Sequence, residues 1–198
     1  VIIALDAGRL MTGRITEETK FDTALHASLA LMSASARAGD NCGLVVFGRR
    51  ILKYLPPKRG LEHIDAVLEA LHDIEPEMIE PSYARAFQYI ASNTKKRAFV
   101  VILTDLVDKD SSKELINSLR LLRPRHLPLV ATIGDRDLNA AVSRLPENIK
   151  DVFTQSAAEE IIHQRESALR LVESLGGMAL DVTAQTVTAK LREAYWKV

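Results

Sequence analysis

Two stretches of the 198-residue chain decide its fold: Val1-Ile2-Ile3-Ala4-Leu5-Asp6 and Ala98-Phe99-Val100-Val101-Ile102-Leu103-Thr104-Asp105. Each is a continuous apolar run that ends near an aspartate. Runs of this kind, without polar alternation, are typical of strands covered on both faces, as in a parallel sheet. In open parallel sheets, ligands bind beyond the carboxyl ends of the strands. The sequence therefore predicts that Asp6 and Asp105 lie at one candidate site.

Strands and helices alternate along the rest of the chain. Apolar runs predict further strands over 42–47, 50–55, 127–133 and 178–182. Only two residues separate 42–47 from 50–55, too few for a crossover, so we expect an antiparallel hairpin ended by Pro56-Pro57. We predict an α/β fold: a three-layer sandwich around a doubly wound, mostly parallel six-stranded sheet with one antiparallel edge strand.

Helical spacing of apolar residues, together with capping residues, predicts the helices between these strands. They cover 21–37, 61–71, 83–91, 113–122, 157–175 and 184–195, with Ser82, Ser111 or Ser112, Ser156 and Thr183 as N-caps of the last four. The stretch 134–137 is expected to be a loop.

Composition limits the classes of function. The 26 basic residues balance the 26 acidic ones, so we expect no nucleic-acid partner. No stretch approaches the ~20 apolar residues of a transmembrane helix, and we expect no membrane contact from this segment. A single cysteine, Cys42, fits a reducing compartment. We expect one domain over 1–198, a fragment of a longer chain, located in the cytoplasm or forming the soluble part of a membrane-anchored protein.

The aspartates at the strand ends are the leading site residues. Carboxylates beside a short polar loop are hard oxygen ligands for Mg²⁺ or Mn²⁺. Alternatively, Asp6 and Asp105 accept backbone N–H bonds or pair with Arg9 in the loop after the first strand. Asp135 and Asp137 follow the strand 127–133 and either extend an acidic rim or are simply solvated.

The chain resembles a von Willebrand factor A domain, most closely the bacterial family known as domain of unknown function fifty-eight. The Asp-x-Gly-Arg-x-Met of that family appears as Asp6-Ala7-Gly8-Arg9-Leu10-Met11. Five further pieces follow in the family's order: Lys20-Phe21-Asp22, Gly39-Asp40-x-x-Gly43-Leu44-Val45-x-Phe47, Glu80-x-x-Tyr83-x-x-Ala86-Phe87, Leu103-Thr104-Asp105-Leu106, and Leu180-Asp181-Val182 before Tyr195.

Cation-binding von Willebrand factor A domains hold a divalent ion with Asp-x-Ser-x-Ser, a threonine and a later aspartate, and the ion takes a partner's carboxylate. In this chain Gly8 and Leu10 stand in place of the two serines. The threonine position falls on Pro81, next to Ser82. The resemblance therefore implies a degenerate metal site with no cofactor. A weakly bound Mg²⁺ is the alternative, with Asp6, Ser82 and Asp105 as its candidate ligands.

Arg9 is expected to stand in for the missing metal, because a guanidinium pairs bidentately with a carboxylate and repels a cation. The predicted binding residues are Asp6, Gly8, Arg9, Ser82 and Asp105. The predicted contact surface consists of the loops 6–11, 80–83 and 105–110.

The resemblance implies a non-enzymatic protein–protein interaction module. Members of the family commonly carry N-terminal membrane segments and are encoded beside MoxR-type AAA+ ATPases, which implies an assembly or chaperone-like task with such a partner. Two alternatives stay open. One is an Mg²⁺-dependent adhesion domain. The other is a haloacid dehalogenase-type phosphohydrolase, although Gly8 replaces its second aspartate and only Lys109 or Lys113 could supply its lysine.

Overall fold

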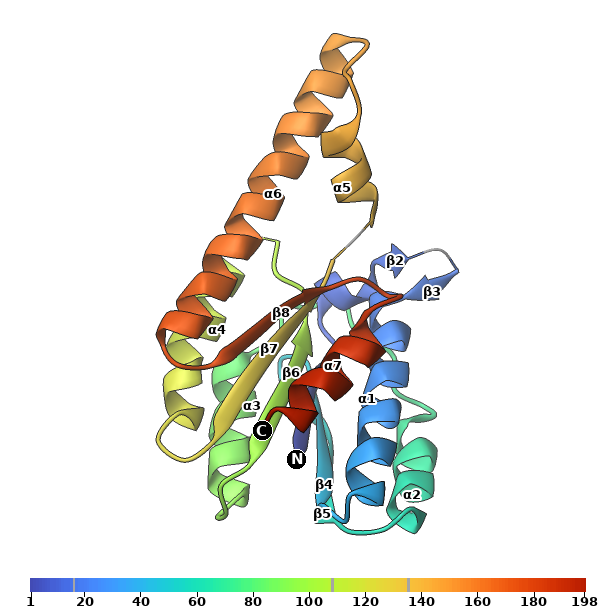
Figure 1. Ribbon diagram of the computed structural model, residues 1–198, viewed down its shortest axis with the longest axis vertical. Coiled ribbons are helices and arrows are strands. Elements are labelled where there is room, and N and C mark those ends of the chain that lie inside the picture. The colour runs from blue at the N-terminus through green and yellow to red at the C-terminus, as the bar shows by residue number, and fades with distance from the viewer. Residues whose placement is uncertain (16, 108, 135) are drawn as a thin grey trace.

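A six-stranded sheet forms the centre of the fold. The computed structural model describes residues 1–15, 17–107, 109–134 and 136–198, with the backbone alone at 109, 136, 137 and 139. The strands of the sheet are β1 (Ile2–Asp6), β4 (Cys42–Phe47), β5 (Ile51–Lys58), β6 (Phe99–Thr104), β7 (Leu127–Ile133) and β8 (Met178–Val182). They lie in the order β5-β4-β1-β6-β7-β8 (Figure 1). All neighbours are parallel except β4 and β5, which confirms the predicted sheet.

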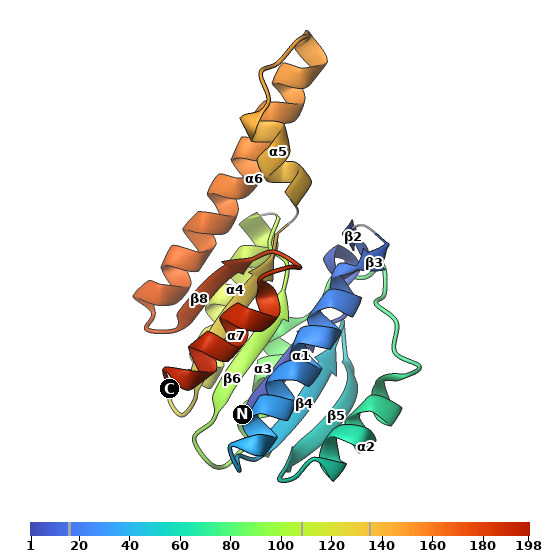
Figure 2. The same ribbon diagram turned by 45° about the vertical axis from the view of Figure 1, so that its right-hand side comes forward.

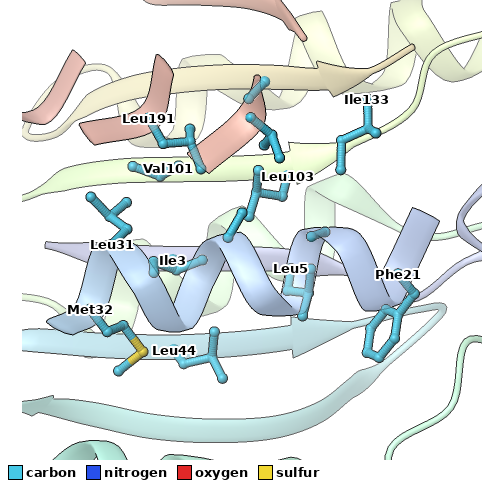
Figure 3. Packing of buried hydrophobic residues seen from close by; sticks show 14 of the residues in the cluster. Ile3, Leu5, Phe21, Leu31, Met32, Leu44, Val101, Leu103, Ile133 and Leu191 are labelled. Atoms are coloured by element: carbon cyan, nitrogen blue, oxygen red, sulfur yellow. The ribbon is translucent and has the colours of Figure 1, made fainter. Parts of the chain in front are cut away.

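Helices cover both faces of this sheet and complete the three layers (Figure 2). One face carries α1 (Lys20–Arg37), α2 (Glu62–Leu71) and α7 (Val187–Trp196), and the other carries α3 (Tyr83–Asn93), α4 (Lys109–Leu122) and α6 (Ile149–Ser174). Side chains alternate along a strand, so β1 packs Ile3 and Leu5 beneath α1 (Figure 3) and Ile2 and Ala4 on the opposite face. Burial on both faces explains why the strand is apolar throughout.

Several element boundaries differ from the predicted ones. β5 continues through both prolines to Lys58. An edge strand tolerates prolines because their missing N–H groups can lie on its open side. α6 begins well before position 157, because the side chain of Asn148 caps it by accepting a hydrogen bond from the N–H of Asp151 at 2.9 Å. α4 begins at Lys109 and α7 at Val187, so neither helix starts at its predicted cap.

Three short features are not predicted by the sequence pattern. They are the 3-10 helix η1 (Arg9–Thr12), the hairpin of β2 (Arg14–Ile15) and β3 (Glu18–Thr19), and α5 (Arg136–Ser143) in place of a loop. Segments this short have little intrinsic stability, so tertiary contacts decide whether they form. The contact for α5 is the neighbouring helix α6, whose Gln155 donates a side-chain hydrogen bond to the carbonyl of Val142 at 2.9 Å.

An arm projects from the body of the molecule. It consists of α5, the following turn and the first half of α6, and it extends past the carboxyl ends of the parallel strands (Figures 1 and 2). Apolar side chains are exposed at its tip: Leu145 is 91% exposed, Ile149 76% and Phe153 72%. Within the described ranges, every helix is too short or too polar to cross a membrane.

Candidate functional site

The two predicted aspartates lie at the same edge of the sheet. β1 and β6 are hydrogen-bonded neighbours with Leu5 opposite Leu103, so Asp6 and Asp105 leave the sheet side by side. Both side chains are buried, as is Thr104 between them. The Thr104 hydroxyl donates to Oδ2 of Asp6 at 2.6 Å, which links the two strand ends directly.

Asp6 is enclosed by neutral donors. Its Oδ1 accepts the backbone N–H of Gly8 at 2.7 Å, and its Oδ2 lies 3.4 Å from the hydroxyl of Tyr83. The Tyr83 hydroxyl is also 2.8 Å from the Thr104 hydroxyl. Because Thr104 has one proton and gives it to Asp6, Tyr83 donates to Thr104 in this arrangement. Burial raises the pKa of Asp6 to about 7, although these hydrogen bonds oppose the rise.

Asp105 is enclosed by cations instead. Its Oδ2 lies 2.5 Å from the Lys20 ammonium, at the start of α1. Its Oδ1 accepts from Nη2 of Arg165 at 2.7 Å and from the N–H of Leu106 at 2.8 Å. Arg165 comes from α6, and both cationic side chains are buried. Asp105, which follows β6, is therefore bound by side chains from α1 and α6, two helices that are remote from it in sequence.

A partly exposed aspartate balances the second cation. Nη1 of Arg165 lies 3.9 Å from Oδ1 of Asp181, at the end of β8. Burial raises the pKa of Asp181, and the charge of Arg165 and a hydrogen bond from Thr132 oppose that rise. The two cations, Lys20 and Arg165, thus face two carboxylates, those of Asp105 and Asp181. This balance is what a cluster of buried charges requires.

Arg9 does not occupy the position predicted for it. Its Nε donates to Oε1 of Glu80 at 2.7 Å, and both side chains are about half exposed. The cations beside Asp105 are Lys20 and Arg165, so the expectation that Arg9 compensates Asp6 and Asp105 is wrong. The η1 turn carries the arginine outward, toward the segment that precedes α3.

Two other predicted site residues, Ser82 and Gly8, contribute no side chain to the two aspartates. The Ser82 hydroxyl is 3.4 Å from Oε1 of Glu114, and its N–H donates to the carbonyl of Gly48. Tyr83, the next residue, is the one that reaches Asp6. At Gly8, a Cβ atom would lie 2.6 Å from Cδ of Pro81, so the loop is closed too tightly for a side chain.

The residues that sequence reasoning missed are Lys20, Tyr83, Thr104 and Arg165. The first three stand within the motif pieces quoted above, so their place in the chain was visible but their role was not. Arg165 carries no local signal, because its partner Asp105 is 60 positions away. The acidic rim expected from Asp135 and Asp137 falls on side chains outside the described residues, and residue 108 of the predicted contact loop 105–110 also lies outside them.

Comparisons with known proteins agree with this fold. A model of the family described as "Protein of unknown function DUF58" matches residues 1–168. An aerotolerance-related membrane protein from Bacteroides fragilis NCTC 9343 is 14% identical, with a TM-score of 0.62 over 100% of this chain and 98% of that one. BatB from Bacteroides thetaiotaomicron is 15% identical, with a TM-score of 0.60 over 98% of this chain and 96% of that one.

The description of a third similar structure identifies the type of fold. The von Willebrand factor type A protein from Catenulispora acidiphila is 12% identical, with a TM-score of 0.60 over 98% of this chain and 41% of that one. No curated protein sequence is similar enough to match. At these identities the likeness concerns the fold alone, and that fold is the von Willebrand factor A type.

Proposed function

The chain belongs to the DUF58 family, and we propose that it is a protein-interaction domain rather than an enzyme. Its carboxyl-edge loops are held by side-chain ion pairs in place of a divalent cation. The observation that carries this proposal is the saturation of both aspartates: each of the four carboxylate oxygens of Asp6 and Asp105 accepts at least one hydrogen bond. An Mg²⁺ ion needs free carboxylate oxygens, so it would have to displace Lys20 and Arg165.

The same geometry argues against the phosphohydrolase alternative. A nucleophilic carboxylate must reach the phosphorus atom with a free oxygen. Asp6 is 1% exposed and both of its oxygens are hydrogen-bonded. The second acid of that mechanism is absent, because Gly8 holds its place. The Mg²⁺-dependent adhesion alternative also loses support, because the carboxylate oxygens that would bind the ion already accept hydrogen bonds.

The partner surface in this proposal combines the carboxyl-edge loops with the arm. Arg9 and Glu80 lie exposed on the loops. The arm adds Leu145, Ile149 and Phe153, three exposed apolar residues close together in sequence. Clustered apolar side chains on a surface mark protein contacts more often than chance, and arginine is enriched among residues that dominate binding energies.

We extend the proposal to the kind of partner. The family resemblance implies a MoxR-type AAA+ ATPase, with this domain acting in an assembly or chaperone-like task. One structural relative is described as a membrane protein, which supports the placement of this domain as the soluble part of a membrane-anchored protein.

The test is whether the immobilised chain captures, from a purified mixture, the MoxR-type ATPase that the family resemblance implies as its partner. Two double variants distinguish the contribution of the arm from that of other exposed apolar residues. One is Ile149→Ser with Phe153→Ser on the arm, and the matched control is Leu61→Ser, at the N-cap of α2, with Leu68→Ser on α2. We expect the arm pair to weaken capture at least tenfold, the control pair to leave it unchanged, and EDTA to have no effect. Capture that requires Mg²⁺, or that survives the arm substitutions, contradicts the proposal.

A further inference from the structure

The net charge of the chain is zero, but several of its basic residues are concentrated at one end of the sheet. The amino ends of the parallel strands, opposite the candidate site, carry an exposed set of residues that we call the basic edge. It consists of Arg37, Lys58, Arg59, Lys95, Lys96, Arg97, Arg123 and Arg125. Among the residues with described side chains, none of these eight forms a salt bridge. The acidic residues near it in sequence include Asp40, after α1, and Glu62 and Glu173, at the ends of α2 and α6.

Hydrogen bonds bring these segments to one surface. The amino group of Val1 donates to the carbonyl of Asn41, beside Asp40, which accepts a hydrogen bond from Tyr195. Nη1 of Arg125 donates to the carbonyl of Thr94 at 3.1 Å, next to Lys95. Both termini of the chain lie at this same end (Figure 1).

A cavity opens within the basic edge. It measures about 520 Å³, and its lining includes Pro57, Thr94 and residues 95–97 together with one carboxylate, that of Asp40. Thr94 is buried, and its hydroxyl has no hydrogen-bond partner among the described residues. The three exposed cations at positions 95–97 beside this cavity are suited to an anionic, hydrogen-bond-accepting group such as a phosphate.

An exposed tryptophan lies at the same end. Trp196 is 65% exposed and lines a second cavity with Arg37 and Arg192, and Val198 beyond it is also exposed. Tryptophan is enriched at the boundary between lipid and water, and basic clusters are attracted to anionic bilayers. Four separate turns supply the basic residues, so the charge covers one end of the molecule. A single-stranded nucleic acid instead favours a groove with stacked aromatic side chains.

We propose that the basic edge binds the surface of a bilayer that contains anionic lipids. This places the candidate site and the arm on the side away from the membrane. The inference does not rest on the proposed partner. The expectation of no membrane contact relied on the absence of an apolar stretch long enough to cross a bilayer, and binding to the bilayer surface does not require such a stretch.

The test is co-sedimentation of the 198-residue chain with vesicles. We expect binding to vesicles of phosphatidylcholine mixed with phosphatidylserine, an anionic lipid that gives the surface a negative potential. We expect no binding to pure phosphatidylcholine, and loss of binding at high salt. The variant Lys95→Glu/Lys96→Glu/Arg97→Glu should bind at least tenfold more weakly. Its control, Arg14→Glu/Arg144→Glu/Lys150→Glu, changes the net charge equally at exposed positions elsewhere.

Three outcomes would overturn the inference. The first is no binding to the anionic vesicles. The second is equal weakening by the control variant, which would show that net charge alone matters. The third is tight binding of a DNA oligonucleotide through the basic edge without vesicle binding. Thermal melting of each variant, all of whose substitutions are exposed, shows whether the fold is retained.

Discussion

The ammonium of Lys20 lies 2.5 Å from the carboxylate of Asp105, although the two residues are 85 positions apart. Lys20 is the first residue of α1, where a cation is disfavoured by the helix dipole. A capping box holds it there: the N–H of Asp22 donates to the Thr19 hydroxyl, and the N–H of Thr19 donates to the Asp22 carboxylate. The buried ion pair with Asp105 offsets the unfavourable position and fastens α1 to the end of β6.

Replacement Lys20→Met is predicted to destabilise the fold by roughly 3 kcal/mol, because it removes one of the two cations that compensate the buried Asp105 and leaves Oδ2 of that carboxylate without its partner. Urea unfolding measures the change. The matched control is Lys190→Met, whose salt bridge with Glu193 is exposed and is expected to contribute less than about 1 kcal/mol. Equal, small effects of both substitutions would show that the buried pair does not support the fold.

Stability should fall as the pH rises through neutrality, and Asp6 is the cause. Its folded-state pKa of about 7 lies above the unfolded value of 3.8. The stabilisation by protonated Asp6 is therefore complete below pH 3.8 and is lost as the pH rises through 7. Each pKa unit corresponds to about 1.4 kcal/mol, so the full effect is about 4 kcal/mol.

The variant Asp6→Asn should remove this slope, because an amide keeps the hydrogen-bond geometry without a charge to desolvate. Urea unfolding between pH 5 and 8 compares it with the native chain and with Asp65→Asn, an exposed control on α2. Asp6→Asn should be the more stable protein at pH 8 and lose that advantage toward pH 5. A pH slope that persists in Asp6→Asn would assign it to another group.

Much of this arrangement could be predicted from the sequence. The apolar runs that end near Asp6 and Asp105 sufficed to place both aspartates at one edge, because strand burial and the parallel arrangement follow from local composition. The identity of the compensating cations could not be predicted. Arg9 is adjacent to Asp6 in sequence, but the η1 turn directs it toward Glu80, and Arg165 reaches Asp105 only because α6 packs across the sheet.

Restoring the serine of a cation-binding loop at Gly8 should destabilise the protein. A Cβ at this position would lie 2.6 Å from Pro81 and 3.0 Å from both Asp6 Oδ1 and the Ile79 carbonyl. Overpacking of this kind costs about 1–3 kcal/mol. Gly8→Ala is the simplest probe by thermal unfolding, and Gly48→Ala, with no contact closer than 3.8 Å, is the control. A Gly8→Ala protein as stable as the native chain would mean that the loop is loosely packed.

Arg9 should matter for binding rather than for stability. Its salt bridge with Glu80 is exposed, and such pairs contribute about 0–1 kcal/mol. Arg9→Ala is expected to leave the melting temperature nearly unchanged while weakening capture of the partner. A sharp drop in melting temperature with unchanged binding by the folded protein would make Arg9 structural and remove it from the partner surface.

Calorimetric titration of the native chain with Mg²⁺ tests most directly whether Lys20 and Arg165 take the place of a metal ion. Both oxygens of Asp105 are engaged by these cations and by a backbone N–H, so an ion would need to break a buried ion pair to bind. We predict no saturable heat of binding at millimolar Mg²⁺. Saturable binding of one ion per chain that disappears in Asp105→Asn would contradict the replacement of the metal by side chains.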